Sequence, residues 1–120
     1  MNVYFRNIFA VLVSLICCIS AYGYDFVAGG IYYSKTSGSE VEVSCKDMAD
    51  NTKAYAGNVV VPAEVVHGGT TYKVTGVGQM AFYTCAQLTS VTLPQSITSI
   101  GMLSFGFCSK LMSVNIPESV

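Results

Sequence analysis

The chain has 120 residues, of which 52% are hydrophobic and 11% are charged, and its formal net charge is −1 at pH 7. This length predicts a single domain. The low fraction of charged residues excludes an acidic or basic tail. The small net charge argues against the electrostatic footprint of a nucleic-acid-binding protein and against a basic patch for an anionic membrane surface.

The amino end has the features of a secretory signal peptide. Residues 1–6 carry one positive charge, residues 8–21 read IFAVLVSLICCISA, and the small-x-small triplet AYG ends at Gly23. A charged start, an apolar middle and a small-x-small end are typical of exported proteins. We expect residues 1–23 to be a signal peptide cleaved after Gly23, and the protein to be secreted or displayed at the cell surface.

Two other interpretations of this segment stay open. The uncharged stretch 8–24 is 17 residues long, close to the minimum for a membrane span, so an uncleaved signal would attach the protein to a membrane through this segment alone. Cys17 and Cys18 suggest a lipid-modified amino terminus, but a small residue usually precedes the modified cysteine, and here Ile16 and Cys17 occupy those places.

Residues 24–73 predict antiparallel strands that together form an N-terminal β cap. Two Gly-Gly pairs, at 29–30 and 68–69, predict tight hairpins, and 41–45 alternates apolar and polar residues as a half-buried strand does. The expected strands are Asp25–Val27, Ile31–Ser34, Val41–Cys45, Val59–Val61, Val65–Val66 and Thr71–Val74.

The carboxy-terminal part of the chain repeats itself. Residues 74–96 read VTGVGQMAFYTCAQLTSVTLPQS, and residues 97–119 read ITSIGMLSFGFCSKLMSVNIPES. Matching residues are 23 apart, among them Gly78 and Gly101, Phe82 and Phe105, Cys85 and Cys108, and Pro94 and Pro117. A fixed period in the twenties predicts a leucine-rich-repeat solenoid, in which each repeat buries its apolar side against its neighbours.

Each repeat contains a strand pattern, L-x-x-V-x-L at 88–93 and L-x-x-V-x-I at 111–116. The pattern predicts a strand that ends at the following proline, Pro94 or Pro117. Gly78 and Gly101 mark the turn into a compact segment, for which we expect about one helical turn. The predicted fold is therefore a β-rich α+β fold, with two repeats at 74–96 and 97–119 behind the cap.

The second repeat, with its pattern I-T-S-I-G-x-x-x-F-x-x-C-S-x-L-x-S-V-x-I-P-x-S-V, resembles the BspA-like leucine-rich repeats of bacterial surface proteins. Residues 59–78 resemble the strand–turn–strand lead-in of such arrays, and residues 24–45 are similar to the start of many such proteins from the Bacteroides group. The resemblance implies an exported binding module without enzymatic activity, which adheres to surface proteins of a host or of bacteria.

Val120 is equivalent to Ile97, so the array looks truncated at its carboxy-terminal end. About three repeats are usually needed for stability. We favour truncation of a longer array, which would make the chain a structural remnant or accessory domain without a ligand of its own. The other interpretations are that the cap supplies the missing burial, or that the open end pairs with another molecule.

No catalytic or cofactor site emerges from the sequence. Gly76-x-Gly78-x-x-Ala81 matches a dinucleotide loop loosely, but the second repeat keeps a single glycine there and no acidic residue follows at the required distance. His67 is the single histidine and cannot complete a zinc site or a hydrolytic triad. We therefore expect no enzyme, no cofactor and no metal.

Cysteine chemistry stays open between two interpretations. Cys85 and Cys108 are equivalent positions on neighbouring repeats, close enough for a disulfide at strand spacing. Stacked side chains point in parallel, however, and free cysteine is among the most buried residue types. The favoured interpretation is a ladder of buried thiols. With Cys45, three cysteines follow the predicted signal, so at least one thiol is free or pairs with another molecule.

The candidate binding face consists of the outward residues of the two repeat strands. These are Ser90 and Thr92 in the first repeat, and Ser113 and Asn115 in the second. Strand faces of this kind are the usual binding surfaces of repeat proteins. This face is neutral and rich in hydroxyl groups, which suits contact with a protein or a glycan.

Overall fold

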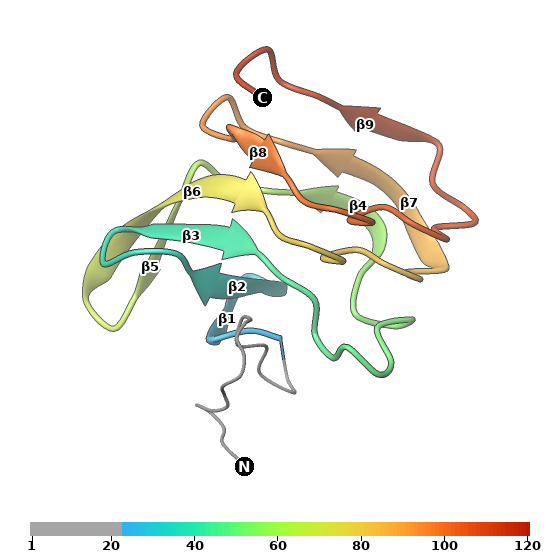
Figure 1. The fold of residues 1–120 in the computed structure, drawn as a ribbon, viewed down its shortest axis with the longest axis horizontal. Coiled ribbons are helices and arrows are strands. Elements are labelled where there is room, and N and C mark those ends of the chain that lie inside the picture. Colours follow the sequence, from blue (N-terminus) through green and yellow to red (C-terminus); the bar gives the residue numbers. More distant parts are fainter. Residues whose placement is uncertain (1–22) are drawn as a thin grey trace.

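The computed structural model describes residues 23–120, which form nine strands in two sheets (Figure 1). The strands are β1 (Phe26–Ala28), β2 (Ile31–Lys35), β3 (Glu40–Val43), β4 (Ala56–Val60), β5 (Glu64–His67), β6 (Thr70–Val77), β7 (Gln87–Thr92), β8 (Ser99–Ile100) and β9 (Ser113–Asn115). The predicted signal peptide, apart from Gly23, lies outside the described residues. Among these residues, no helix is long and apolar enough to cross a membrane.

The first sheet has the order β1-β2-β3-β6-β5, with β8 paired to β6. Both hairpins predicted at Gly-Gly pairs are confirmed: β1 and β2 pair around Gly29 and Gly30, and β5 and β6 pair around Gly68 and Gly69. All four glycines have positive φ, as a two-residue hairpin loop of type I′ requires. The Gly-Gly pairs therefore fix the register of both hairpins.

Parallel pairing joins the amino-terminal half to the repeats. β3 lies parallel to β6, and β4 lies parallel to β7 in the second sheet, whose order is β4-β7-β9. The prediction that residues 24–73 form antiparallel strands is therefore wrong for β4, whereas β3 pairs antiparallel with β2 as predicted and has a parallel partner on its other side. The parallel partners of β3 and β4 lie 31 to 34 residues away, with a bulge in each ladder, so a search for a 23-residue period does not detect them.

Within the carboxy-terminal part, strand partners are 23 residues apart. β6 pairs with β8 through Gly76–Ser99 and Val77–Ile100, and β7 pairs with β9 with Val91 opposite Val114. Equivalent strands consequently lie side by side in each sheet, as the order from β4 through β7 to β9 shows in Figure 1.

No helix is present in residues 23–120, so the α+β prediction is wrong and the described fold is all-β. In the compact segment of the first repeat, which begins at Gly78, every second N–H group donates to a carbonyl of the same segment. Ala81 donates to the Gly78 carbonyl and Tyr83 to the Met80 carbonyl. The N–H groups between them donate instead to the second repeat, as Phe82 does to the Ser104 carbonyl at 2.8 Å. A helix would consume both sets of donors internally, so bonding to a neighbour prevents it.

Residues in the left-handed backbone conformation also recur at the period of 23 residues. Met80 and Thr84 have φ near +58°, and their equivalents Leu103 and Phe107 have φ of +56°. Positive φ is uncommon for residues other than glycine and interrupts right-handed helix. Each compact segment is therefore a chain of tight turns.

Gly78 and Gly101 do not have positive φ. They lie where two backbones approach each other closely. A Cβ at Gly101 would lie 2.6 Å from the Gln79 nitrogen, and a Cβ at Gly78 would lie 2.9 Å from the Val43 carbonyl oxygen. Each glycine thus presses against the preceding layer of the structure. The glycine that the sequence marks as a turn is needed because no side chain fits there.

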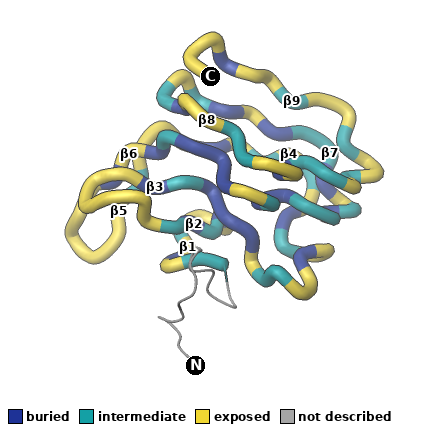
Figure 2. The backbone as a smooth tube through the Cα atoms, viewed as in Figure 1, coloured by how far each residue is buried: buried dark blue, intermediate teal, exposed yellow. Residues whose placement is uncertain are grey.

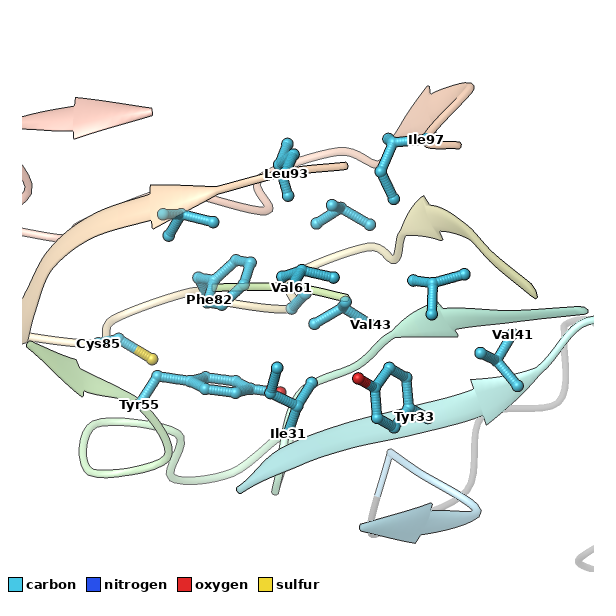
Figure 3. Close-up of a cluster of buried hydrophobic side chains, with 14 of the residues drawn as sticks. Ile31, Tyr33, Val41, Val43, Tyr55, Val61, Phe82, Cys85, Leu93 and Ile97 are labelled. Carbon is cyan, nitrogen blue, oxygen red and sulfur yellow. The ribbon is translucent and has the colours of Figure 1, made fainter. Parts of the chain in front are cut away.

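The core lies between the two sheets and the compact segments. Figure 3 shows Leu93 and Ile97 at one side of it and Tyr33 and Val41 at the other, with Val43, Val61 and Phe82 between them. Phe82 stacks on Phe105 with centroids 5.2 Å apart and packs on Tyr55 at 4.7 Å. Burial is greatest in the middle of the molecule and falls toward β9 (Figure 2).

Candidate binding face

The outer face of the β4-β7-β9 sheet carries three rows of side chains that cross the strands. The ladders place Ala56 beside Gln87, Asn58 beside Ser90 and Ser113, and Val60 beside Thr92 and Asn115. Lys110 extends the first row, because its Nζ donates to Gln87 Oε1 at 3.2 Å. We call this set of eight residues plus Lys110 the outer face.

The four residues predicted from the sequence all lie on the outer face. Thr92, Ser113 and Asn115 are exposed, whereas Ser90 is half-buried. Ser90 Oγ donates to Asn58 Oδ1 at 2.6 Å, which fixes its hydroxyl in the row. Three of the four side chains are thus accessible to a partner.

Asn115 differs from the other three because its amide is already engaged. Its Oδ1 accepts from the Leu93 N–H at 2.8 Å, and its Nδ2 donates to the Leu93 carbonyl at 3.1 Å. One layer earlier, the Val61 N–H donates to the main-chain carbonyl of Thr92. The Asn115 side chain takes the place of a main-chain acceptor where β9 ends.

Sequence reasoning missed the other five members of the outer face, and of these Asn58 makes two hydrogen bonds within the sheet. Its Oδ1 accepts hydrogen bonds from Ser90 and from Thr89 Oγ1, the latter at 3.2 Å. The signal that could have found it is the alternation of β4, in which Gly57 and Val59 are half-buried between the exposed Ala56, Asn58 and Val60. The parallel pairing of β4 with β7 was not predictable from that alternation.

Electrostatically the outer face is nearly neutral. Lys110 is its one ionisable residue, and the other side chains are hydroxyls, amides, Ala56 and Val60. A surface of this composition steers charged molecules weakly. It suits a partner that makes hydrogen bonds and apolar contacts across the strands.

A second asparagine, Asn51, was also missed and belongs to the interior. It is 4% exposed, and its Nδ2 donates to the carbonyls of Ala81 at 3.0 Å and Tyr83 at 3.1 Å. The equivalent carbonyls in the second repeat, Ser104 and Gly106, accept from N–H groups of the first repeat. One side-chain amide therefore replaces two main-chain donors at the amino-terminal side of the first repeat.

His67, which was weighed above for a zinc site or a triad, packs against an aromatic ring. His67 is exposed at the end of β5 and stacks on Phe26, with centroids 4.1 Å apart. On β3, Glu42, which the sequence did not single out as a site residue, lies over Gly78, and burial raises the pKa of its carboxyl group. Among residues 23–120, no group of three or more His, Cys, Asp or Glu side chains could hold a metal ion.

Cys45, Cys85 and Cys108 are free thiols. Cys85 is fully buried, and its Sγ lies 3.3 Å from the Asn51 carbonyl oxygen. Burial raises the pKa of Cys85 to about 11 and also raises the pKa of Cys108, which is half-buried. The interpretation of Cys85 and Cys108 as packed thiols agrees with this arrangement, and neither is activated as a nucleophile.

The layered strands and period match a known family. A family model described as "BspA type Leucine rich repeat region (6 copies)" matches residues 70–120. Residues 70–120 are therefore similar to a BspA-type leucine-rich repeat region. The resemblance noted from the second repeat is confirmed, and the fold is of leucine-rich-repeat type.

Solved structures of leucine-rich repeat proteins are similar over most of the chain. A leucine-rich repeat protein from Bacteroides ovatus ATCC 8483 is 33% identical, with a TM-score of 0.70 over 81% of this chain and 24% of its own. A leucine rich cell surface protein from Faecalibacterium prausnitzii A2-165 is 25% identical, with a TM-score of 0.60 over 79% of this chain and 24% of its own.

A third similar structure is a leucine-rich repeat protein from Bacteroides capillosus ATCC 29799. It is 27% identical, with a TM-score of 0.62 over 78% of this chain and 65% of its own. The chain thus spans about a quarter of the first two relatives and just under two thirds of the third. No curated protein matches the chain.

Proposed function

We propose that this protein is an exported, non-enzymatic binding module of BspA type, which contacts a protein or a glycan at the cell surface through its outer face. The observation that carries the proposal is the alignment of neutral polar side chains in rows across three parallel strands. Strand faces formed in this way are the usual binding surfaces of repeat proteins. The partner we favour is a surface protein of a host or of bacteria.

In this proposal the repeats form a short solenoid and the amino-terminal strands cap it. The support is the contact of Asn51 and Tyr55 with the first compact segment. Terminal units of repeat arrays generally differ from the internal ones because they cover an otherwise open apolar end. Export is supported by the signal-like segment 1–23 and by the family relationship.

A second candidate function is an accessory domain without its own ligand. The observation that favours it is the exposure of large apolar side chains in the last part of the chain. They are Met102, Leu103, Phe107, Met112, Ile116 and Val120. Exposed apolar surface of this extent marks an interaction site or a liability to aggregate.

Binding measurements on variants of the outer face test the first candidate. Purified protein is passed over immobilised host matrix proteins and bacterial surface glycans. Thr92→Arg and Ser113→Arg place long cations on the face and should reduce binding at least tenfold, as the loss of a central contact does. Thr71→Arg, at an exposed position of β6, is the matched control and should leave binding unchanged.

Two results would contradict the proposal. Equal binding by all three variants would remove the outer face as the contact surface. A folded wild-type protein that binds none of the immobilised molecules would favour the accessory domain. Thermal melting and size exclusion separate the candidates further, because an accessory domain should aggregate or melt without cooperativity on its own.

A further inference from the structure

Strand β9 lies at the edge of the second sheet, and within residues 23–120 its one partner there is β7 (Figure 1). An edge strand presents main-chain N–H and C=O groups that can pair with another strand. One layer earlier, the Thr89 carbonyl accepts from the Met112 N–H, and the Leu93 N–H donates to Asn115 Oδ1. The equivalent groups of the second repeat, the Met112 carbonyl and the Ile116 N–H, therefore face the free edge of β9.

These edge groups are complementary to a second copy of themselves. Val114 lies midway between Met112 and Ile116, so its own N–H and C=O face the same edge, because the direction of main-chain groups alternates along a strand. In an antiparallel pair with a two-fold axis at Val114, the two Val114 residues exchange two hydrogen bonds. Each Ile116 N–H then meets the Met112 carbonyl of the other copy, which makes four hydrogen bonds.

The side chains select this register. It places Met112 opposite Ile116 of the other copy, and both are exposed apolar side chains, at 87% and 55%. Continued beyond the strand, it brings Lys110 opposite Glu118 of the other copy, and these are exposed side chains of opposite charge. A shift of two residues would set Glu118 opposite Met112 and lose both matches.

We propose that two copies of this protein associate through β9, antiparallel and about a two-fold axis at Val114. Both copies use the same surface, so association stops at two. The second sheet then continues as β4-β7-β9-β9-β7-β4, with Ser113 of one copy beside Asn115 of the other on the outer face. The contact needs no ligand and is independent of the proposed function, but it would double the width of the outer face.

The test is the mass in solution of the protein expressed as the full chain, residues 1–120. Sedimentation equilibrium of the soluble product, with no partner added, should show a reversible monomer–dimer equilibrium. Met112→Lys places a cation in the contact at a side chain that is almost fully exposed in one copy, and it should weaken association at least tenfold. Val60→Lys, at an exposed apolar position of β4, is the matched control and should leave the equilibrium unchanged.

Charge reversal and cross-linking test the register. Lys110→Glu and Glu118→Lys should each raise the dissociation constant about threefold to tenfold, as exposed pairs do, and the double variant should restore it. Val114→Cys should form a disulfide-linked dimer under mild oxidation, because the Cα atoms of a hydrogen-bonded pair lie about 5.5 Å apart, within disulfide range. Ser113→Cys, which lies opposite Asn115 of the other copy, should not.

Four outcomes would overturn the proposal. A monomer at every concentration up to about 1 mM would refute the dimer. Species that grow beyond two copies would refute a closed two-fold contact. Cross-linking through Ser113→Cys in place of Val114→Cys would refute the register, and so would a double charge reversal that stays as weak as the single ones.

Discussion

Phe82 and Phe105 hold the same place in two repeats with the same pattern, yet Phe82 is fully buried and Phe105 is half-buried. The difference is larger at the end of the strands, where Leu93 is 3% exposed and its equivalent Ile116 is 55% exposed. Figure 2 shows this change along the stack. Burial in this fold is therefore a property of the neighbours of a repeat and not of its own sequence.

Main-chain hydrogen bonds show the same contrast. In the first repeat, Met80, Phe82 and Thr84 donate to carbonyls of the second repeat. The equivalent N–H groups of Leu103, Phe105 and Phe107 have no acceptor within residues 23–120. The second repeat thus shows what the first would be without a following layer.

The two phenylalanines give the largest expected effect. Phe82→Ala removes a fully buried ring and should lower the free energy of unfolding by about 3–5 kcal/mol. Phe105→Ala should cost clearly less, because its ring is half-buried and is stacked on Phe82. Urea denaturation measures both, and equal losses would contradict the difference in burial.

Asn51→Ala should destabilise the amino-terminal side of the first repeat. The substitution leaves the carbonyls of Ala81 and Tyr83 without their side-chain donor, at a cost of about 1–3 kcal/mol for buried groups that lose a partner. Asn58→Ala, on the exposed face of β4, is the matched control and should cost less. Urea denaturation measures the free energy of unfolding of both variants. An unchanged free energy in Asn51→Ala would show that water replaces the amide.

A smaller effect should separate Asn115 from Thr92, its equivalent in the first repeat. Asn115→Ala breaks two part-buried hydrogen bonds to the Leu93 main chain, each worth about 1 kcal/mol. Thr92→Ala should be nearly neutral, because the exposed Thr92 side chain makes no hydrogen bond to the sheet within residues 23–120. Melting temperatures of the two variants test this order, and a larger loss in Thr92→Ala would reverse it.

The last expected effect is absent at neutral pH and is a dependence of stability on pH in the alkaline range. Burial raises the pKa of Cys85 to about 11 and of Tyr33 to about 12. The folded protein keeps these protons where the unfolded chain, with ordinary pKa values of 9.0 and 10.0, releases them. Stability should therefore fall as pH rises from about 9 through 11 to 12.

Denaturation at several pH values measures this decline. Cys85→Ala should weaken its first part. Tyr33→Phe should weaken the part that extends toward pH 12 without abolishing it, because burial raises the pKa of Tyr55 even further. The matched change in the second repeat, Cys108→Ala, should alter the profile less because that thiol is half-buried. An unchanged profile in Cys85→Ala would contradict the buried thiol.

Much of the repeat region could be predicted from the sequence. The 23-residue period, the two Gly-Gly hairpins and the resemblance to BspA-type repeats follow from residue identity, because tight turns need glycine and a stack of repeats needs apolar residues at equivalent positions. The positions of Ser90, Thr92 and Ser113 on one face follow from strand alternation. These features are local or periodic, so a single chain displays them.

The tertiary structure alone decided how the non-repeating half joins the repeats. β3 and β4 enter parallel ladders through main-chain hydrogen bonds, which any residue can make, and a bulge in each ladder hides the register. Asn51 and Asn115 replace main-chain groups of residues far away in the chain. Likewise, turns replace the expected helical segment because alternate N–H groups bond to the next layer, and such a partner exists only after the chain has folded.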